Sequence, residues 1–175
     1  VVLQKMVYPQ VSGILFTADP ISNNHQMITI NASYGLGEAI VSGLVNPDLI
    51  KYSKLKGKIV EYQVANKELM IEAIAGGGTI RKNVEKELST IPAISDAQIQ
   101  QLALLATKVE NYYNVPQDLE WAIEEDVLFL LQTRPITSLF PLPTPKPDDE
   151  NLHIYFSFGH AQMNTNPISP LGLSF

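Results

Sequence analysis

The sequence comprises 175 residues, of which 45% are hydrophobic and 17% are charged, so the chain is long enough to bury a substantial hydrophobic core. Its net charge of −6, and the absence of any basic run interleaved with aromatic residues, argue against a nucleic-acid-binding protein. The absence of cysteine excludes disulfides, thiolate metal sites and thiol nucleophiles, and the absence of an apolar run of about 18 residues argues against a transmembrane helix.

Strand patterns dominate the first third of the chain, where β-branched and aromatic residues alternate with polar ones between turn formers. The expected strands are residues 1–7, 13–16, 27–31, 50–54 and 58–64. Tyr8-Pro9-Gln10 joins the first two strands, and Lys56-Gly57 forms a tight turn between the last two.

A helix interrupts these strands. Gly35 and Gly37 stand at its entrance, apolar residues then recur at helical spacing as far as Leu44, and Asn46-Pro47 ends it. Backbone N–H groups at such an entrance can approach a phosphate. The third glycine and the later acidic residue of the dinucleotide fingerprint are missing, so a plain turn before a helix, with Glu38 favoured by the helix dipole, is the simpler interpretation.

Residues 75–79, Ala-Gly-Gly-Gly-Thr, invite comparison with a phosphate-binding loop. No lysine followed by serine or threonine comes after the glycines, however, and Ile80 follows instead. We therefore expect a flexible loop here.

The clearest helical pattern covers residues 96–113. Ser95 and Gln98 form the two halves of a capping box, and Ile99, Leu102, Ala106, Val109 and Tyr113 form an apolar stripe. Pro116 prevents the helix from continuing.

Residues 116–135 predict a β-hairpin. Side chains alternate between the two faces of a strand, so Asp118, Glu120 and Ala122 share one face, as do Leu128, Leu130, Gln132 and Arg134 on the return strand. With Glu125, Asp126 and Val127 as the turn, Glu120 faces Gln132 and Asp118 faces Arg134. A slip of one residue would instead place Leu119 opposite Gln132.

This polar cluster suits a metal-bound polyphosphate, because Mg²⁺ prefers oxygen ligands and an arginine holds phosphate oxygens. The two carboxylates, Asp118 and Glu120, and the amide oxygen of Gln132 supply such ligands, and we expect Glu120 and Gln132 to be the metal ligands. The alternative is an ordinary cross-strand ion pair between Asp118 and Arg134 on a solvated face.

Two further candidates have structural alternatives. Residues 4–7 are either a strand edge against which a purine lies or a plain core strand. His25, His153 and His160 are the chain's histidines, and because no sequence motif surrounds them they are expected to be structural or surface residues rather than a base or a phosphoryl carrier.

The domain organisation follows from composition. Residues 1–138 form an α+β unit with a mostly antiparallel sheet, residues 139–151 are a proline-rich linker, and residues 152–175 begin a second domain. The chain begins at Val1 without a signal peptide and ends within an apolar stretch, so we expect part of a longer, cytoplasmic protein.

Five motifs, in the same order, resemble the nucleotide-binding domain of the pyruvate phosphate dikinase and phosphoenolpyruvate synthase family, which has an ATP-grasp fold. They are LQKMV at 3–7, VSGILFTADP at 11–20, NASYGLGEAIVSG at 31–43, PQDLEW at 116–121 and LLQTRPIT at 130–137. The resemblance implies that residues 1–138 are the carboxyl-terminal half of that domain and that ATP and Mg²⁺ are its cofactors.

The resemblance also implies roles for individual residues. The magnesium and the ATP phosphates are held by Asp118, Glu120, Gln132 and Arg134. The remaining nucleotide contacts are Gln4, Lys5, Met6 and Val7 on the adenine side, Glu38 in the pocket and Thr17 along the phosphates.

Residues 139–175 are similar to the opening of the antibiotic-binding domain of the rifampin phosphotransferases. That similarity implies transfer of the β-phosphate of ATP, through a histidine in a domain absent from this sequence, to a rifamycin-type acceptor, leaving AMP and phosphate. The amino-terminal half of the ATP-grasp domain is also missing, so we expect this chain alone to be inactive. The alternatives are a phosphoenolpyruvate synthase or pyruvate phosphate dikinase, and a non-catalytic binding module.

Overall fold

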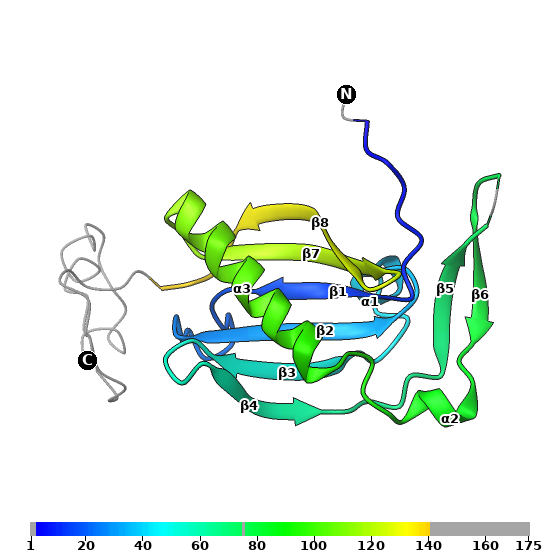
Figure 1. Ribbon diagram of the computed structural model, residues 1–175, viewed down its shortest axis with the longest axis horizontal. Helices are drawn as coiled ribbons and strands as arrows, with labels where there is room; N and C mark the ends of the chain where they lie inside the picture. Colours follow the sequence, from blue (N-terminus) through cyan, green and yellow to red (C-terminus); the bar gives the residue numbers. More distant parts are fainter. Residues whose placement is uncertain (1–2, 75, 141–175) are drawn as a thin grey trace, which may run out of the picture. The chain divides into compact units, whose positions relative to one another are not determined.

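A six-stranded antiparallel sheet forms the centre of the computed structural model, which describes residues 3–74 and 76–140 (Figure 1). The strand order is β4-β3-β2-β1-β7-β8. The strands are β1 (Val11–Phe16), β2 (Met27–Tyr34), β3 (Asp48–Ser53), β4 (Lys58–Gln63), β7 (Gln117–Glu124) and β8 (Val127–Pro135). The predicted α+β class with a mostly antiparallel sheet is confirmed.

Helix α3 (Asp96–Tyr113) crosses one face of this sheet and forms the main hydrophobic core with it (Figure 1). The sheet contributes alternate residues from its strands, among them Leu15, Ile30 and Trp121, because every second side chain faces the helix. The helix contributes Ile99, Leu102, Ala103, Ala106 and Val109. The opposite face of the sheet therefore carries the residues left out of this core.

The bounds and caps of α3 agree with the sequence prediction. The Ser95 side chain accepts a hydrogen bond from Gln98 N, and the Gln98 side chain accepts one from Ser95 N. Asn114 ends the helix in the left-handed conformation, with φ of 56°.

Two predictions in the first third of the chain were wrong. Residues 3–7 were expected to be part of a strand but pair with no strand among the described residues, because β1 is already paired with β2 on one side and β7 on the other. The helix expected to reach Leu44 is a single turn, α1 (Glu38–Val41), because Gly43 adopts φ of +68° and ends it.

A second, two-stranded sheet was not predicted. It pairs β5 (Leu69–Ala73) with β6 (Thr79–Asn83), and Gly76, Gly77 and Gly78, all with positive φ, lie between them. The short helix α2 (Lys86–Ser89) follows β6. Ile71 of β5 packs with Ala39 and Val45 in a small second cluster, so this hairpin is attached to the segment around α1.

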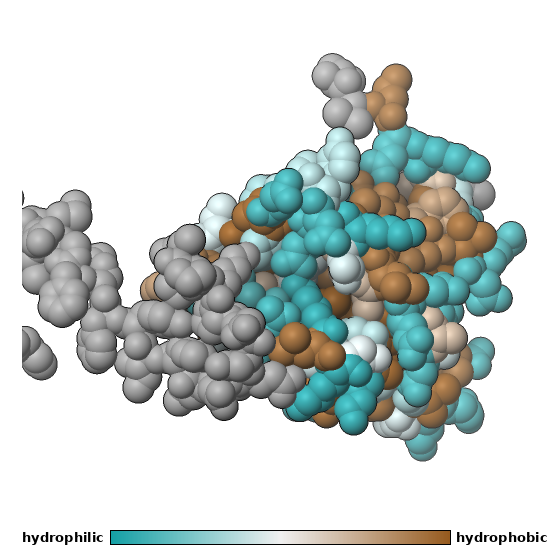
Figure 2. All heavy atoms as spheres, turned by 60° about the vertical axis from the view of Figure 1, so that its left-hand side comes forward, coloured by the Kyte–Doolittle hydropathy of each residue, from teal (hydrophilic) through white to brown (hydrophobic). Residues whose placement is uncertain are grey.

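In the view of Figure 2 the hydrophobic residues of the described region gather toward the right-hand side, with hydrophilic side chains between and around them. Exposed apolar residues such as Leu104 and Tyr112, on the outer side of α3, are ordinary at a protein surface. No helix within residues 3–140 is both long and apolar enough to cross a membrane. The predicted linker at 139–151 and second domain at 152–175 fall almost wholly outside the described residues and stay predictions.

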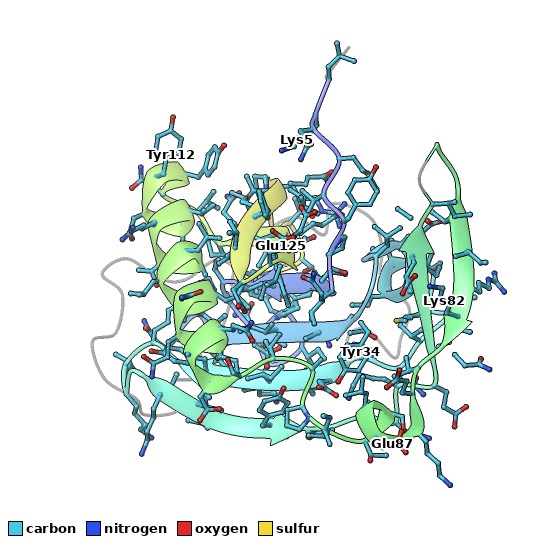
Figure 3. The ribbon with its side chains drawn as sticks, turned by 45° about the vertical axis from the view of Figure 1, so that its right-hand side comes forward. Lys5, Tyr34, Lys82, Glu87, Tyr112 and Glu125 are labelled. Atoms are coloured by element: carbon cyan, nitrogen blue, oxygen red, sulfur yellow. The ribbon has the colours of Figure 1, made fainter. Side chains whose placement is uncertain are left out.

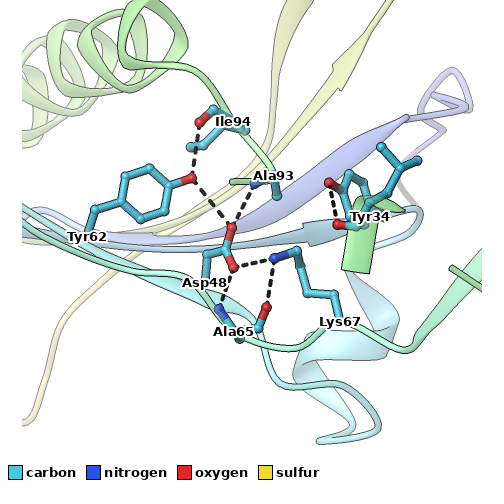
Figure 4. Close-up of polar contacts among 8 residues, drawn as sticks. Tyr34, Asp48, Tyr62, Ala65, Lys67, Ala93 and Ile94 are labelled. Carbon is cyan, nitrogen blue, oxygen red and sulfur yellow. Dashed lines mark hydrogen bonds and ion pairs between the residues drawn. The ribbon is translucent and has the colours of Figure 1, made fainter. Parts of the chain in front are cut away.

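Asp48, at the start of β3, is a fully buried carboxylate at the centre of a polar network (Figure 4). Its two oxygens accept hydrogen bonds from Lys67 Nζ at 2.6 Å, Ala65 N at 2.8 Å and Ala93 N at 2.7 Å. The hydroxyl of Tyr62 donates to Ile94 O at 3.0 Å, and burial raises the pKa of this phenol. The network joins β3, β4, the segment before β5 and the loop before α3.

Replacing Asp48 by alanine is expected to reduce the free energy of unfolding by about 3–5 kcal/mol, because Lys67 would be left buried without its counter-ion. Urea unfolding of the full chain measures this loss. The control is Glu61→Ala, which breaks the more exposed pair with Lys51 and is expected to cost less than about 1 kcal/mol. Equal losses in the two variants would contradict the role given to Asp48.

Candidate functional site

The hairpin of β7 and β8 brings the predicted polar residues together. Asp118 lies opposite Arg134 and Glu120 lies opposite Gln132, as the sequence predicted. Directly opposed residues of antiparallel strands project from the same face, so these four side chains share the face that α3 does not cover.

The turn of this hairpin differs from the prediction. It has two residues rather than three, Glu125 and Asp126, with φ of 49° and 63°, and Val127 already belongs to β8. The register then shifts between Glu120 and Trp121, which leaves Leu131 as an extra residue in β8. This bulge compensates for the shorter turn and preserves both polar pairs.

The shorter turn also changes the predicted faces in the first half of β8. Leu128 and Leu130 were expected on the face of Gln132, but they lie opposite Ile123 and Trp121 on the side of the core. Leu128 packs against that core. The bulge therefore separates the apolar half of β8 from its polar half.

Asp118 and Arg134 form a cross-strand ion pair, as expected if this face of the hairpin were an ordinary solvated surface. Arg134 Nε donates to Asp118 Oδ2 at 2.7 Å, and this hydrogen bond with the nearby charge raises the pKa of Arg134. The Arg134 side chain is 66% exposed whereas that of Asp118 is 9% exposed. Asp118 Oδ1 is buried and has no hydrogen-bond partner among the described residues, so one acceptor atom is left for a cation, a water or a ligand donor.

A pocket of about 300 Å³ connects this hairpin with the amino-terminal segment. Six predicted site residues line it, namely Gln4, Lys5, Met6, Val7, Glu120 and Gln132. Gln4 Nε2 donates to the carbonyl of Leu131, the bulged residue, at 3.4 Å. Figure 3 shows Lys5 on this extended segment and Glu125 at the tip of the hairpin.

The other four predicted residues do not line this pocket. Asp118 and Arg134 are the next pair on the same face of the hairpin, two residues further from the turn than Glu120 and Gln132. Glu38 is exposed at the start of α1, directly after Gly37, which does line the pocket. Thr17 is fully buried, and its Oγ1 accepts a hydrogen bond from Gln117 N at 2.9 Å, so its side chain anchors the beginning of β7.

Ser12 was not among the residues predicted to form the site, and Leu36 and Gly37 were predicted as part of a helix entrance whose N–H groups can approach a phosphate. All three line the pocket. The available signal was the serine within the otherwise apolar strand VSGILF, and the alternation of that strand places Ser12 on the face of Glu120.

The donor atoms suit a hard cation better than a transition metal. The carboxylate of Glu120 and the amide oxygen of Gln132 face one another, and Asp118 supplies a further carboxylate nearby. No group of three or more histidine, cysteine, aspartate or glutamate residues that could hold a metal exists in the described part of the chain. Carboxylate and amide oxygens are donors that Mg²⁺ accepts, and this ion usually takes several further ligands from water and phosphate.

Comparison with known proteins gives a family match over residues 1–150, to the family described as "Pyruvate phosphate dikinase, AMP/ATP-binding domain". Rifampicin phosphotransferase of Bacillus subtilis (strain 168) is 46% identical over 175 residues, which is 100% of this chain and 20% of that protein. The protein of the same name from Bacillus cereus is 47% identical over the same length. Phosphoenolpyruvate synthase of Pyrococcus furiosus is 43% identical over 146 residues, covering 79% of this chain and 18% of that protein. The chain thus spans about a fifth of the length of these curated relatives.

The turn geometry can be tested by replacing Glu125 with asparagine and Asp126 with glycine. Both positions have positive φ, which Asn-Gly adopts with less strain, so the double variant is expected to be more stable by about 1 kcal/mol. Thermal unfolding of the full chain measures this gain. A lower unfolding temperature would mean that a different turn closes the hairpin.

Proposed function

Because the chain belongs to the family of the pyruvate phosphate dikinase AMP/ATP-binding domain, we propose that it is part of an ATP-dependent phosphotransferase and supplies one side of its nucleotide site. The observation that carries this proposal is the pocket that Gln4–Val7 share with Glu120 and Gln132. These two segments are more than 100 residues apart in the sequence and meet only through the fold. We assign the ATP-grasp fold, of which residues 1–138 would be the carboxyl-terminal half.

Segment 4–7 lies against the adenine in this proposal. It pairs with no strand in the described part of the chain, so its backbone N–H and C=O groups are outside the sheet ladder there and are available to the edge of a purine. Met6 supplies a polarisable apolar side chain for contact with the ring. The bond from Gln4 to Leu131 holds the segment beside β8.

Glu120 and Gln132 would hold a magnesium ion, and Asp118 and Arg134 would lie along the phosphates. Bound Mg²⁺ neutralises the charge of the phosphates and orients them. The Arg134 side chain is 66% exposed and an arginine is charged at neutral pH, so it can hold a phosphate oxygen. Thr17 acts through Gln117 and positions β7, and Glu38 contributes negative charge beside the pocket.

The proposed reaction is transfer of the β-phosphate of ATP, through a histidine of another domain, to a rifamycin-type acceptor, with AMP and phosphate as products. Support comes from identity over the full chain to proteins named rifampicin phosphotransferase, whereas the phosphoenolpyruvate synthases match over 79% of it. In this assignment residues 152–175 begin the acceptor domain. The amino-terminal half of the ATP-grasp domain and the histidine domain lie in parts of the protein beyond this sequence.

A phosphoenolpyruvate synthase or pyruvate phosphate dikinase is the second candidate, favoured by 43% identity to the synthase of Pyrococcus furiosus. Assaying the complete protein with rifampicin and with pyruvate as phosphoryl acceptors decides between the two. A non-catalytic module would phosphorylate neither.

Alanine at Glu120 or Gln132 in the complete protein is expected to weaken Mg²⁺-dependent ATP binding at least about tenfold, since each removes a metal ligand. Isothermal titration calorimetry with Mg²⁺ and ATP measures the affinity, and circular dichroism checks the fold. Glu124→Ala is the matched control, because Glu124 is another carboxylate of β7 but lies opposite Val127 outside the pocket. Wild-type affinity in both Glu120→Ala and Gln132→Ala would show that the hairpin has a structural role and does not bind the metal.

A further inference from the structure

Ser12 connects two parts of the pocket that are distant in the sequence. It is buried in β1, where it lies opposite Ala122 of β7, and its Oγ donates a hydrogen bond to the carbonyl of Gly35 at 2.5 Å. Ser12, Ala122 and Glu120 line one side of the pocket. Leu36 and Gly37, the two residues after Gly35, line another.

The turn at Gly35 is constrained from three directions. Gly35 N donates to Gln10 O at 2.9 Å, Leu36 N donates to Ile71 O at 2.8 Å, and Ser12 holds the Gly35 carbonyl. Gly35 has φ of +75°, and a Cβ at this position would lie 2.3 Å from Ile71 O, so another residue cannot replace it without displacing β5. Of these three bonds, only the one from Ser12 comes from a side chain and can be removed by a single conservative substitution.

We propose that Ser12 is a positioning residue of the nucleotide pocket, whose hydroxyl holds the Gly35–Gly37 turn at the position where Leu36 and Gly37 face the ligand. The inference rests on the proposed nucleotide site and adds to it a residue that acts through the turn. Removing the hydroxyl leaves the buried Gly35 carbonyl without this donor, and the turn is then held by its two backbone hydrogen bonds alone, so its position relative to Glu120 is less tightly fixed.

Ser33 provides a matched control. It lies directly opposite Ser12 on β2 and is equally buried, with 1% exposure for each. Its Oγ has no hydrogen-bond partner among the described residues. Ser33→Ala therefore removes the same atom from the neighbouring position of the sheet without releasing the turn.

The experiment measures the affinity of the complete protein for ATP with Mg²⁺ and with EDTA. Ser12→Ala is expected to weaken binding roughly five- to tenfold in both conditions, because the turn contacts the nucleotide and not the metal. Ser33→Ala is expected to bind as the wild type does. Ser12→Thr, which keeps the hydroxyl and suits a strand, is expected to restore most of the affinity lost in Ser12→Ala.

Glu120→Ala is the comparison variant. It is expected to bind ATP more weakly than the wild type in the presence of Mg²⁺ but equally well in EDTA. Wild-type affinity in Ser12→Ala, or an equal loss in Ser33→Ala, overturns the role of Ser12 even if Glu120→Ala behaves as expected. Wild-type affinity in Glu120→Ala overturns the metal site instead, so the two claims fail on different measurements. Unfolding temperatures of the two serine variants show whether a loss of affinity reflects a loss of fold.

Discussion

The register of the β7–β8 hairpin is the constraint on which the candidate site depends. Glu120 faces Gln132 and Asp118 faces Arg134 only because Leu131 bulges out of β8 and offsets a turn of two residues. The two-residue turn places Leu128 on the side of the core, and the bulge then returns Gln132 and Arg134 to the polar face, so the two features together serve the packing and the polar pairs. The Leu131 carbonyl also accepts a long hydrogen bond, 3.4 Å, from Gln4 of the amino-terminal segment that lines the pocket. Without this bulge, a hairpin with this turn would exchange polar and apolar residues between its faces.

The rest of the fold holds the other sides of the pocket in place by hydrogen bonds between segments distant in sequence. The buried Asp48 ties β3 and β4 to the loops before β5 and α3, and this fixes the point from which β5 begins. Ile71 of β5 in turn receives Leu36 N, and Ser12 holds Gly35 from the opposite side. The site is therefore supported by the strands of the sheet and not by the chain neighbours of its residues alone.

The sequence was sufficient to predict the features that depend on neighbouring residues, namely the bounds of α3 and the polar pairs of the hairpin. A capping box, an apolar stripe and Pro116 gave the bounds of α3, and alternation with matched polar residues gave the two polar pairs of the hairpin. The bulge was not predictable because it leaves composition unchanged, and Glu125-Asp126 is not a usual sequence for a two-residue turn. Strand β6 was missed because both of its faces are exposed, so its hydrophobicity does not alternate. The serine in the apolar strand VSGILF marked Ser12 as unusual, but its role depends on a partner 23 residues away, which the local sequence does not identify.

The central claim is that the hairpin and the amino-terminal segment bind one nucleotide between them. The most direct measurement is a crystal structure of the complete protein with Mg²⁺ and a non-hydrolysable ATP analogue. The account predicts a metal ion bound by a Glu120 carboxylate oxygen and the Gln132 amide oxygen, with the adenine against residues 4–7. A nucleotide bound elsewhere, or a metal held by other residues while Glu120 and Gln132 face solvent, would contradict it.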